Sequence, residues 1–407
     1  MAPTIVLDMR YLQGAFRNSR DGGLGGMGVY SRGLWREVVR QRPDWHYVAV
    51  GDRGRIPHQF RELIDESGAA ATIVPRGLAG AAPFPLRLNE TRYGWILNMV
   101  ESELGWGSPG RGLPSHVDLL HGLSQLPPPR RSRVPSVATI YDLIPFGAAG
   151  SSKPSALTRA RRSYLARIWR TDRFLCISDS SRRDLLSMTD ISPSRVGVAY
   201  PGLDRTTFRP VHCSDGELKD RYAIEPPYFL NVGVCFGRKN PGALLAALRR
   251  VAAAPEGDGA SLVLVGPYDV IPGSARRIER EAAELGIAER IRLIGNVDDE
   301  DLARLYTNAA ALVFPSLYEG FGYPALESLA CGTPPIVSAT SSLPEAVGSL
   351  GRLVNPREPA EIAEAMLDRL RELPAGRLDV EGPAWARRFS WEAAAGAYIA
   401  IYEELLD

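Results

Sequence analysis

Two glutamates eight residues apart mark the part of this chain best suited to chemistry. Glu319 stands beside the glycine-rich turn 320–322, and Glu327 lies about one turn inside the helix predicted to follow. Pro324 suits the start of that helix and Gly332 its end. Glycine lets a backbone approach a ligand closely, and the N–H groups at a helix N-terminus attract anions. The pattern predicts a site whose carboxylates hold hydroxyls on two groups of one ligand. The alternative is a turn whose carboxylate only complements the helix dipole.

A basic pair, Arg238 and Lys239, follows the apolar run 228–234. Lys239 is one of three lysines in a chain whose other basic residues are arginines, and an Asn-Pro step then opens a helix. A guanidinium fork beside a compact ammonium group suits a diphosphate. We therefore favour a phosphate site over a solvated strand end.

The glycine loop 22–28 contains the pattern G-x-G-x-x-G, and Asp52 follows it as the ribose-binding acid of a nicotinamide site would. Such a loop should follow its strand immediately, yet about thirteen residues separate Asp8 from Gly22. An NAD-dependent oxidoreductase is therefore the less favoured alternative.

No metal site is expected. Asp298, Asp299 and Asp301 resemble a D-x-D pair, but they precede a predicted helix, where acids cap the N-terminus. The histidines and cysteines are scattered, without a metal-binding spacing.

Composition excludes several classes of protein. The 407 residues carry a net charge of +1, which argues against a nucleic-acid binder. The beginning of the chain does not read as a signal peptide, and no apolar run approaches the roughly 20 residues that span a bilayer. We expect a cytoplasmic protein. The arginine-rich helix predicted at 157–170 could make weak contact with the inner membrane face, but a solvated helix face is the preferred interpretation. The sequence does not predict an oligomeric state.

Short apolar runs alternate with amphipathic segments along the chain, a pattern typical of parallel sheets covered by helices on both faces. The pattern stops at a polar stretch, 201–227, which we interpret as a linker, and then begins again. The sequence thus predicts an α/β protein with two Rossmann-like doubly wound domains that face a cleft. The expected domains are 1–205, joined by the C-terminal helix 391–407, and 206–390.

Longer motifs resemble the retaining glycosyltransferases of family 4, which have the GT-B fold. The segment E-G-F-G-Y-P-A-L-E is similar to their E-x7-E signature, and F-L-N-V-G-V-C-F-G-R-K-N resembles their phosphate-binding loop. Matching motifs in the first half extend the resemblance over almost the whole chain, and it is strongest to the mannosyltransferase-B-like subgroup.

The resemblance implies roles for individual residues. Glu319, Arg238, Lys239 and Tyr141 would be catalytic. Tyr141 stands where the family commonly has histidine, so it could either contact the sugar or be a strand-end aromatic. His121 and Asp142 would lie on the acceptor side, although a structural role is preferred for His121. The residues expected to bind the donor are Gly26, Gly28, Gly233, Val297, Leu302, Gly320, Phe321, Gly322 and Glu327.

The implied activity is transfer of a sugar, with mannose favoured, from a nucleoside diphosphate to a saccharide, lipid-linked or natural-product acceptor, without a metal or other cofactor. The acceptor would bind in the N-terminal half and the donor in the C-terminal half. Glu319 would contact the transferred sugar and Glu327 the ribose. The alternative of another class is a non-catalytic protein that binds sugar nucleotides.

Overall fold

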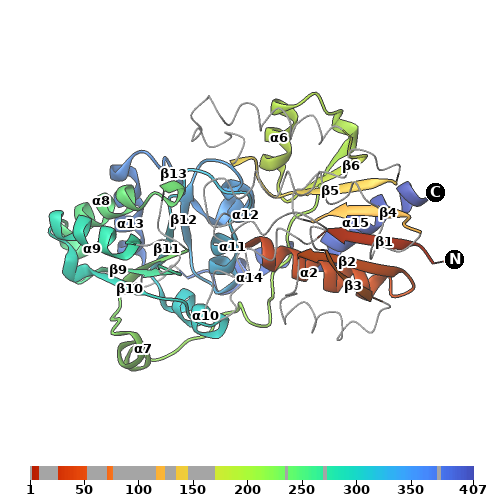
Figure 1. Ribbon diagram of the computed structural model, residues 1–407. Helices are drawn as coiled ribbons and strands as arrows, with labels where there is room; N and C mark the ends of the chain where they lie inside the picture. Colours follow the sequence, from red (N-terminus) through yellow and green to blue (C-terminus); the bar gives the residue numbers. More distant parts are fainter. Residues whose placement is uncertain are drawn as a thin grey trace. The chain divides into compact units, whose positions relative to one another are not determined.

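The computed structural model describes residues 2–8, 26–52, 71–76, 116–123, 134–144, 170–233, 237–268, 273–373 and 377–407. The chain divides into two compact units (Figure 1). The first contains Met1–Gly202 with Ser390–Asp407, and the second contains Leu203–Phe389. The predicted boundaries were residues 205 and 390.

The first unit is built on a parallel sheet whose described strands have the order β3-β2-β1-β4-β5-β6-β7. Its strands are β1 (Thr4–Asp8), β2 (His46–Asp52), β3 (Ala71–Arg76), β4 (Leu119–Gly122), β5 (Ser136–Ile140), β6 (Arg173–Cys176) and β7 (Val196–Val198). Its described helices are α2 (Gly26–Gln41), α6 (Asp179–Met188) and α15 (Trp391–Leu406). Helix α15 packs against α2, so the C-terminal segment belongs to the same unit as the N-terminus.

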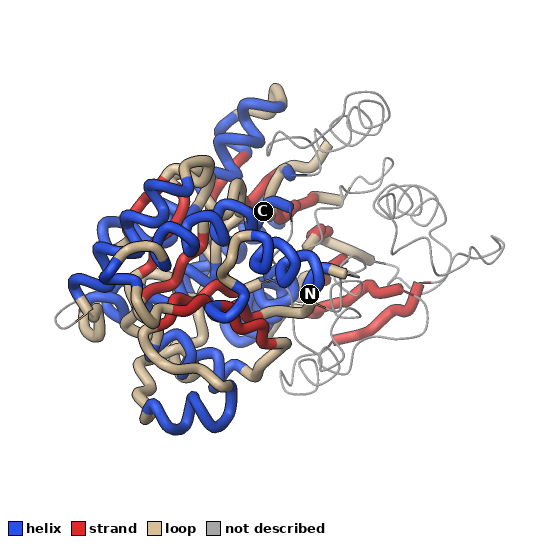
Figure 2. The backbone as a smooth tube through the Cα atoms, turned by 90° about the vertical axis from the view of Figure 1, so that its left-hand side faces the viewer, coloured by secondary structure: helices blue, strands red, loops and turns tan. Residues whose placement is uncertain are grey.

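The second unit is also doubly wound, with strand order β10-β9-β8-β11-β12-β13. Its strands are β8 (Tyr228–Val232), β9 (Ser261–Val265), β10 (Ile291–Ile294), β11 (Ala311–Phe314), β12 (Pro335–Ser338) and β13 (Arg352–Val354). Its helices are α7 (Asp215–Tyr222), α8 (Pro241–Ala252), α9 (Ser274–Glu284), α10 (Asp299–Asn308), α11 (Tyr323–Ala330), α12 (Leu343–Val347), α13 (Pro359–Glu372) and α14 (Glu381–Ala386). Figure 2 shows these strands running between helices.

The local sequence explains these elements. Every residue of β11 is buried, as expected for a strand covered on both faces. Helix α8 buries Leu244, Leu248 and Val251, whose spacing of three and four residues forms one apolar stripe facing the sheet. The alternation of strand and helix therefore produces the predicted fold class of two Rossmann-like domains.

The interpretation of 201–227 as a linker was wrong in part, because this stretch contains helix α7. Ser214 and Glu217 form a capping box at its start. At its end Arg221 forms an ion pair of 2.5 Å with the buried carboxylate of Asp301 in α10. These contacts fix a polar helix whose residues supply little apolar surface.

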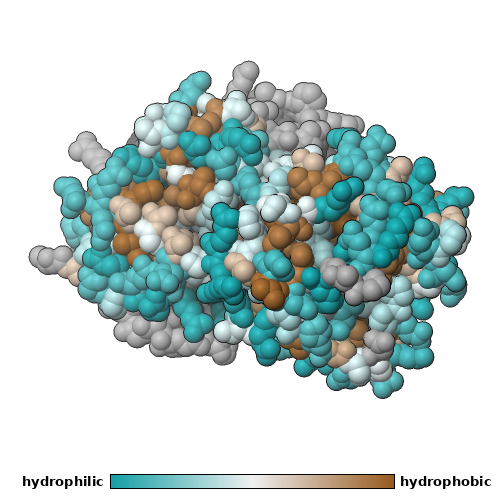
Figure 3. Space-filling model, turned by 180° about the vertical axis from the view of Figure 1, so that it is seen from behind, coloured by the Kyte–Doolittle hydropathy of each residue, from teal (hydrophilic) through white to brown (hydrophobic). Residues whose placement is uncertain are grey.

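Two predicted features lie outside the described residues: most of the glycine loop 22–28 and the arginine-rich helix up to residue 169. Among the described helices, none is long and apolar enough to span a membrane. The face of the molecule in Figure 3 is mostly hydrophilic with scattered apolar spots.

Candidate functional site

The strand order places the predicted site residues of the second unit together. Strands β8 and β11 are neighbours, and the chain leaves β8 toward β9 on one side and β11 toward β12 on the other. The carboxyl ends of two such strands define the point at which doubly wound folds bind ligands. Arg238 and Lys239 follow β8, and Glu319 follows β11. The candidate site is this switch point.

Glu319 and the basic pair form one ionic cluster. Oε1 of Glu319 lies 2.7 Å from Nη1 of Arg238 and 2.9 Å from Nζ of Lys239. The side chains of Glu319 and Lys239 are only 8% and 14% exposed, whereas that of Arg238 is 39% exposed. Lys239 is therefore not a solvated strand-end residue, which was the less favoured interpretation of the sequence, because a buried carboxylate and the ring of Phe314, 4.1 Å from Nζ, cover it.

The charge state of Glu319 follows from these contacts. Burial raises the pKa of its carboxyl group, but Lys239 and Arg238 together outweigh burial, so the pKa lies below its ordinary value. Glu319 is thus an anion at neutral pH, and it compensates part of the positive charge beside it.

The two loops of the site are tied to each other. The backbone N–H of Leu317 donates to the carbonyl of Arg238 at 2.7 Å, and Arg238 Nη1 donates to the carbonyl of Tyr318 at 3.0 Å. The side chain of Asn240, at a positive φ of 59°, donates to the carbonyls of Pro315 and Pro356. The cations are therefore held on a rigid support.

The glycines of the site occupy positions that need them. Gly322 has φ of 104°, and a Cβ there would lie 2.5 Å from Cδ2 of Leu343. Gly233 has φ of 113°, and a Cβ there would lie 3.5 Å from Nζ of Lys239. Gly320 lies between Glu319 and Phe321 in the same turn. Phe321 itself is buried against Phe389, with ring centroids 5.4 Å apart, so its side chain belongs to the core of this unit.

Two serines that were not predicted as site residues form hydrogen bonds with the backbone of the turn. Ser341 Oγ accepts a hydrogen bond of 3.0 Å from the backbone N–H of Glu319. Ser342 Oγ lies within hydrogen-bonding distance of the carbonyls of Glu319 and Phe321, at 2.9 and 2.8 Å. The available signal was their position just after β12, at the same sheet edge as the glutamate.

Glu327 lies inside α11, as predicted. Its Oε2 accepts a hydrogen bond of 2.8 Å from the hydroxyl of Tyr306, which is fully buried in α10. Burial raises the pKa of Glu327 to about 7, although the Tyr306 hydrogen bond opposes this. Glu327 therefore titrates near neutral pH, whereas Glu319 is ionised there.

Helix α10 begins beside the expected base-binding segment. Val297 and Leu302 are both partly buried at its start. Asp298 caps the helix through a bond of 2.8 Å to the backbone N–H of Asp301. Asp298 thus has the predicted capping role, and among the described residues no group of three or more histidine, cysteine or acidic side chains could hold a metal ion.

The structure gives Tyr141 and His121 places in the core of the first unit. Tyr141 is 3% exposed, and its hydroxyl contacts Ser31 Oγ and the carbonyl of Leu123, both at 2.8 Å. His121 is 1% exposed and contacts Thr139 Oγ1 at 2.8 Å and the hydroxyl of Tyr402. For His121 this is the structural role preferred from the sequence, and for Tyr141 these contacts favour the strand-end aromatic over a contact with the sugar.

The switch point of the first unit lies between β1 and β4, which are neighbours, and the remaining candidates belong to α2 and to the segment after β5. Gly26 opens helix α2 and Gly28 is buried in its first turn. Asp142 follows β5 and accepts a bond of 3.0 Å from the backbone N–H of Ile144. Nothing in these contacts brings Asp142 into a catalytic arrangement.

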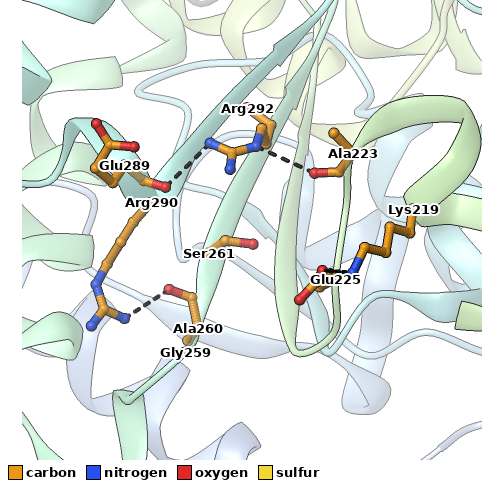
Figure 4. Close-up of a pocket in the computed structure, with 9 residues that line it drawn as sticks. All are labelled: Lys219, Ala223, Glu225, Gly259, Ala260, Ser261, Glu289, Arg290 and Arg292. Carbon is orange, nitrogen blue, oxygen red and sulfur yellow. Dashed lines mark hydrogen bonds and ion pairs between the residues drawn. The ribbon is translucent and has the colours of Figure 1, made fainter.

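A separate pocket of about 440 Å³ lies at the amino ends of β8, β9 and β10, the opposite edge from Glu319 (Figure 4). Lys219 in it is paired with Glu225 at 2.6 Å, and Arg290 and Arg292 donate to backbone carbonyls. The cationic side chains of this pocket thus have partners within the protein and contribute to the stability of the fold.

The fold and site define a two-unit α/β protein with a cationic site at a switch point. The first unit matches the family model described as Glycosyltransferase Family 4 over residues 24–207, and the second matches Glycosyl transferases group 1 over residues 216–374. The chain belongs to the glycosyltransferases of family 4 with the GT-B fold.

Individual relatives agree. The serotype-specific mannosyltransferase WbdA of Escherichia coli is 32% identical over 258 residues, which are 60% of this chain and 30% of WbdA. The chain thus spans about a third of that relative. The sucrose-phosphate synthase of Thermosynechococcus elongatus has the same fold, with a TM-score of 0.71 at 23% identity over 99% of both chains. The Anabaena HepE structure with UDP-glucose has a TM-score of 0.66 at 15% identity, over 98% of this chain and 99% of that one.

Proposed function

We propose that this protein is a retaining, metal-independent glycosyltransferase that uses a nucleoside-diphosphate sugar. The observation that carries the proposal is the pairing of Arg238 and Lys239 with Glu319 at the carboxyl ends of β8 and β11. Two fixed cations at a switch point suit a diphosphate, and the N-terminus of α11 adds favourable potential. Mannose is the favoured sugar, because WbdA is a mannosyltransferase. The acceptor is a saccharide, a lipid-linked sugar or a small molecule.

The residues at the site have separate tasks in this reaction. The bond between the anomeric carbon and the diphosphate oxygen breaks, and the departing diphosphate takes the electron pair. Arg238, Lys239 and the start of α11 stabilise the negative charge that develops on the diphosphate. They already point at this position before the reaction, so the stabilisation is preorganised. The acceptor oxygen bonds to the anomeric carbon on the face that the diphosphate leaves, and its proton passes to the departing diphosphate oxygen. Glu327 accepts hydrogen bonds from the hydroxyl groups of the ribose.

Calorimetric titration with a panel of nucleoside diphosphates tests the donor site. We expect at least one to bind, and Lys239→Ala to weaken it on the order of a hundredfold. Lys219→Ala is the matched control, because it also removes a lysine paired with a glutamate, but at the opposite edge of the sheet. If both variants lose affinity for the diphosphate equally, or if neither loses affinity, the diphosphate binds elsewhere.

Turnover of the corresponding labelled sugar nucleotide, measured in EDTA, tests the reaction. We expect the sugar to reach an acceptor in chelator with its anomeric configuration retained. Binding without turnover against a broad acceptor panel would indicate a non-catalytic sugar-nucleotide protein. Activity only after addition of Mn²⁺ or Mg²⁺ would refute metal independence.

A further inference from the structure

The carboxylate of Glu319 occupies the position relative to Arg238 and Lys239 that a phosphate oxygen would take. A single atom, Oε1, lies within 3 Å of the nearest nitrogen of both cations, at 2.7 and 2.9 Å. These are the distances of charge-assisted hydrogen bonds, and a phosphate oxygen would bind the same donors at similar distances. The site thus supplies both cations with an anionic partner from within the protein.

Lys239 depends on this arrangement more than Arg238 does. Its ammonium group lies against Glu319 and the ring of Phe314, and a Cβ on Gly233 would stand 3.5 Å from it. Arg238 is more exposed and has a second partner in the carbonyl of Tyr318. A buried ammonium group without an anion would be costly, so the carboxylate stabilises the lysine in its charged form.

We propose that Glu319 is the internal counter-ion of the diphosphate site, which keeps the two cations in place when the site is empty and opposes the binding of diphosphate. This inference rests on the proposed function, and it adds a role to the sugar contact that the family resemblance implies. An anion that enters the site must share Arg238 and Lys239 with the carboxylate, and its own charge is repelled by it.

The counter-ion has a consequence for the catalytic cycle. With Glu319 ionised, the three side chains carry one net positive charge, and without it they carry two. The carboxylate therefore weakens the binding of the product nucleoside diphosphate, which must leave before the next donor enters. Neutralising Glu319 should tighten the binding of any diphosphate, including one that has no sugar and no nucleoside.

Inorganic pyrophosphate is the probe that isolates this effect, and calorimetry measures its affinity. We expect Glu319→Gln to bind pyrophosphate tighter than wild type, on the order of tenfold at low ionic strength. Glu319→Asp keeps the charge but withdraws it by one methylene, and should give a smaller increase. If the glutamine variant does not fold, the aspartate variant carries the test alone.

Asp301→Asn is the matched control. Asp301 is also a buried carboxylate, 3% exposed, that pairs with two cations, Arg221 at 2.5 Å and Arg304 at 2.7 Å. Neutralising Asp301 removes the same charge from the same unit. The Asp301→Asn variant should therefore bind pyrophosphate with the wild-type affinity. An equal increase in this control would show that net charge alone is responsible and would overturn the proposal.

The outcomes separate this inference from the proposed function. If Lys239→Ala weakens pyrophosphate but Glu319→Gln leaves it unchanged or weaker, the counter-ion role is wrong and the diphosphate site stands. If Lys239→Ala has no effect on pyrophosphate, the diphosphate site itself is misplaced. If Glu319→Gln binds pyrophosphate more tightly and turns over the sugar nucleotide more slowly, both the counter-ion role and the proposed function are supported.

Discussion

The hydroxyl of Tyr306 donates a hydrogen bond to Oε2 of Glu327, and this pair connects helices α10 and α11 across 2.8 Å. Burial raises the pKa of Glu327 to about 7, whereas an unfolded glutamate titrates at its ordinary value of 4.5. The two glutamates of the site thus differ in their protonation, although both lie near Lys239, because only Glu319 contacts its ammonium group directly.

This raised pKa predicts a pH dependence of stability. Between pH 4.5 and about 7 the folded state binds more protons than the unfolded state, so the contribution of Glu327 to stability is full below pH 4.5 and is lost as pH rises through 7. We expect wild type to lose on the order of 2 kcal/mol relative to Glu327→Gln between pH 5 and pH 8. Urea unfolding of both proteins measures the difference, and a constant difference across this range would contradict it.

The Glu319–Lys239 pair predicts a coupling in stability. Lys239→Ala should destabilise the protein by about 2 kcal/mol, because it leaves a buried carboxylate with one partner fewer. Adding Glu319→Gln should recover part of that loss, since the carboxylate is then neutral. A double-mutant cycle by urea unfolding measures the coupling. Strict additivity of the two changes would mean that the pair contributes nothing to the fold.

The buried His121 predicts sensitivity to acid. Burial lowers the pKa of its imidazole to about 3, whereas the group titrates near 6.5 when unfolded. Its neutral form therefore contributes stability that is complete above pH 6.5 and is lost as pH falls toward 3, by up to about 1.4 kcal/mol per pH unit. His121→Gln should show a shallower fall of melting temperature across this range. A slope equal to that of wild type would exclude His121 as a source of acid sensitivity.

Two glycines in paired helices predict opposite effects of the same substitution. A Cβ on Gly33 in α2 would lie 2.2 Å from Cε2 of Trp391 in α15, so Gly33→Ala should cost about 1–3 kcal/mol through overpacking. A Cβ on Gly396 in α15 would meet nothing within 4 Å, so Gly396→Ala should stabilise by about 0.5–1 kcal/mol through helix propensity. Melting temperatures measure both, and a neutral Gly33→Ala would show that the α2–α15 contact can adjust.

Some elements could be predicted because their residues carry the signal locally. The C-terminal helix was predicted at 391–407 and is observed at Trp391–Leu406, since a capping serine and apolar spacing are properties of neighbouring residues. Strand β13 was missed because two of its three residues are exposed. Helix α7 was missed because polar residues dominate it, and its contact with Asp301 comes from far along the chain.

The sequence by itself determined which residues of the second unit form the site, because Glu319, Glu327, Arg238 and Lys239 stand in recognisable local patterns of turn, helix start and strand end. Only the tertiary structure decided that Glu319 neutralises Lys239 and that Tyr141 and His121 belong to the core. The physical reason is that these contacts depend on which strands are neighbours and on what packs above them. Strand order joins segments distant along the chain, and local spacing carries no information about that order.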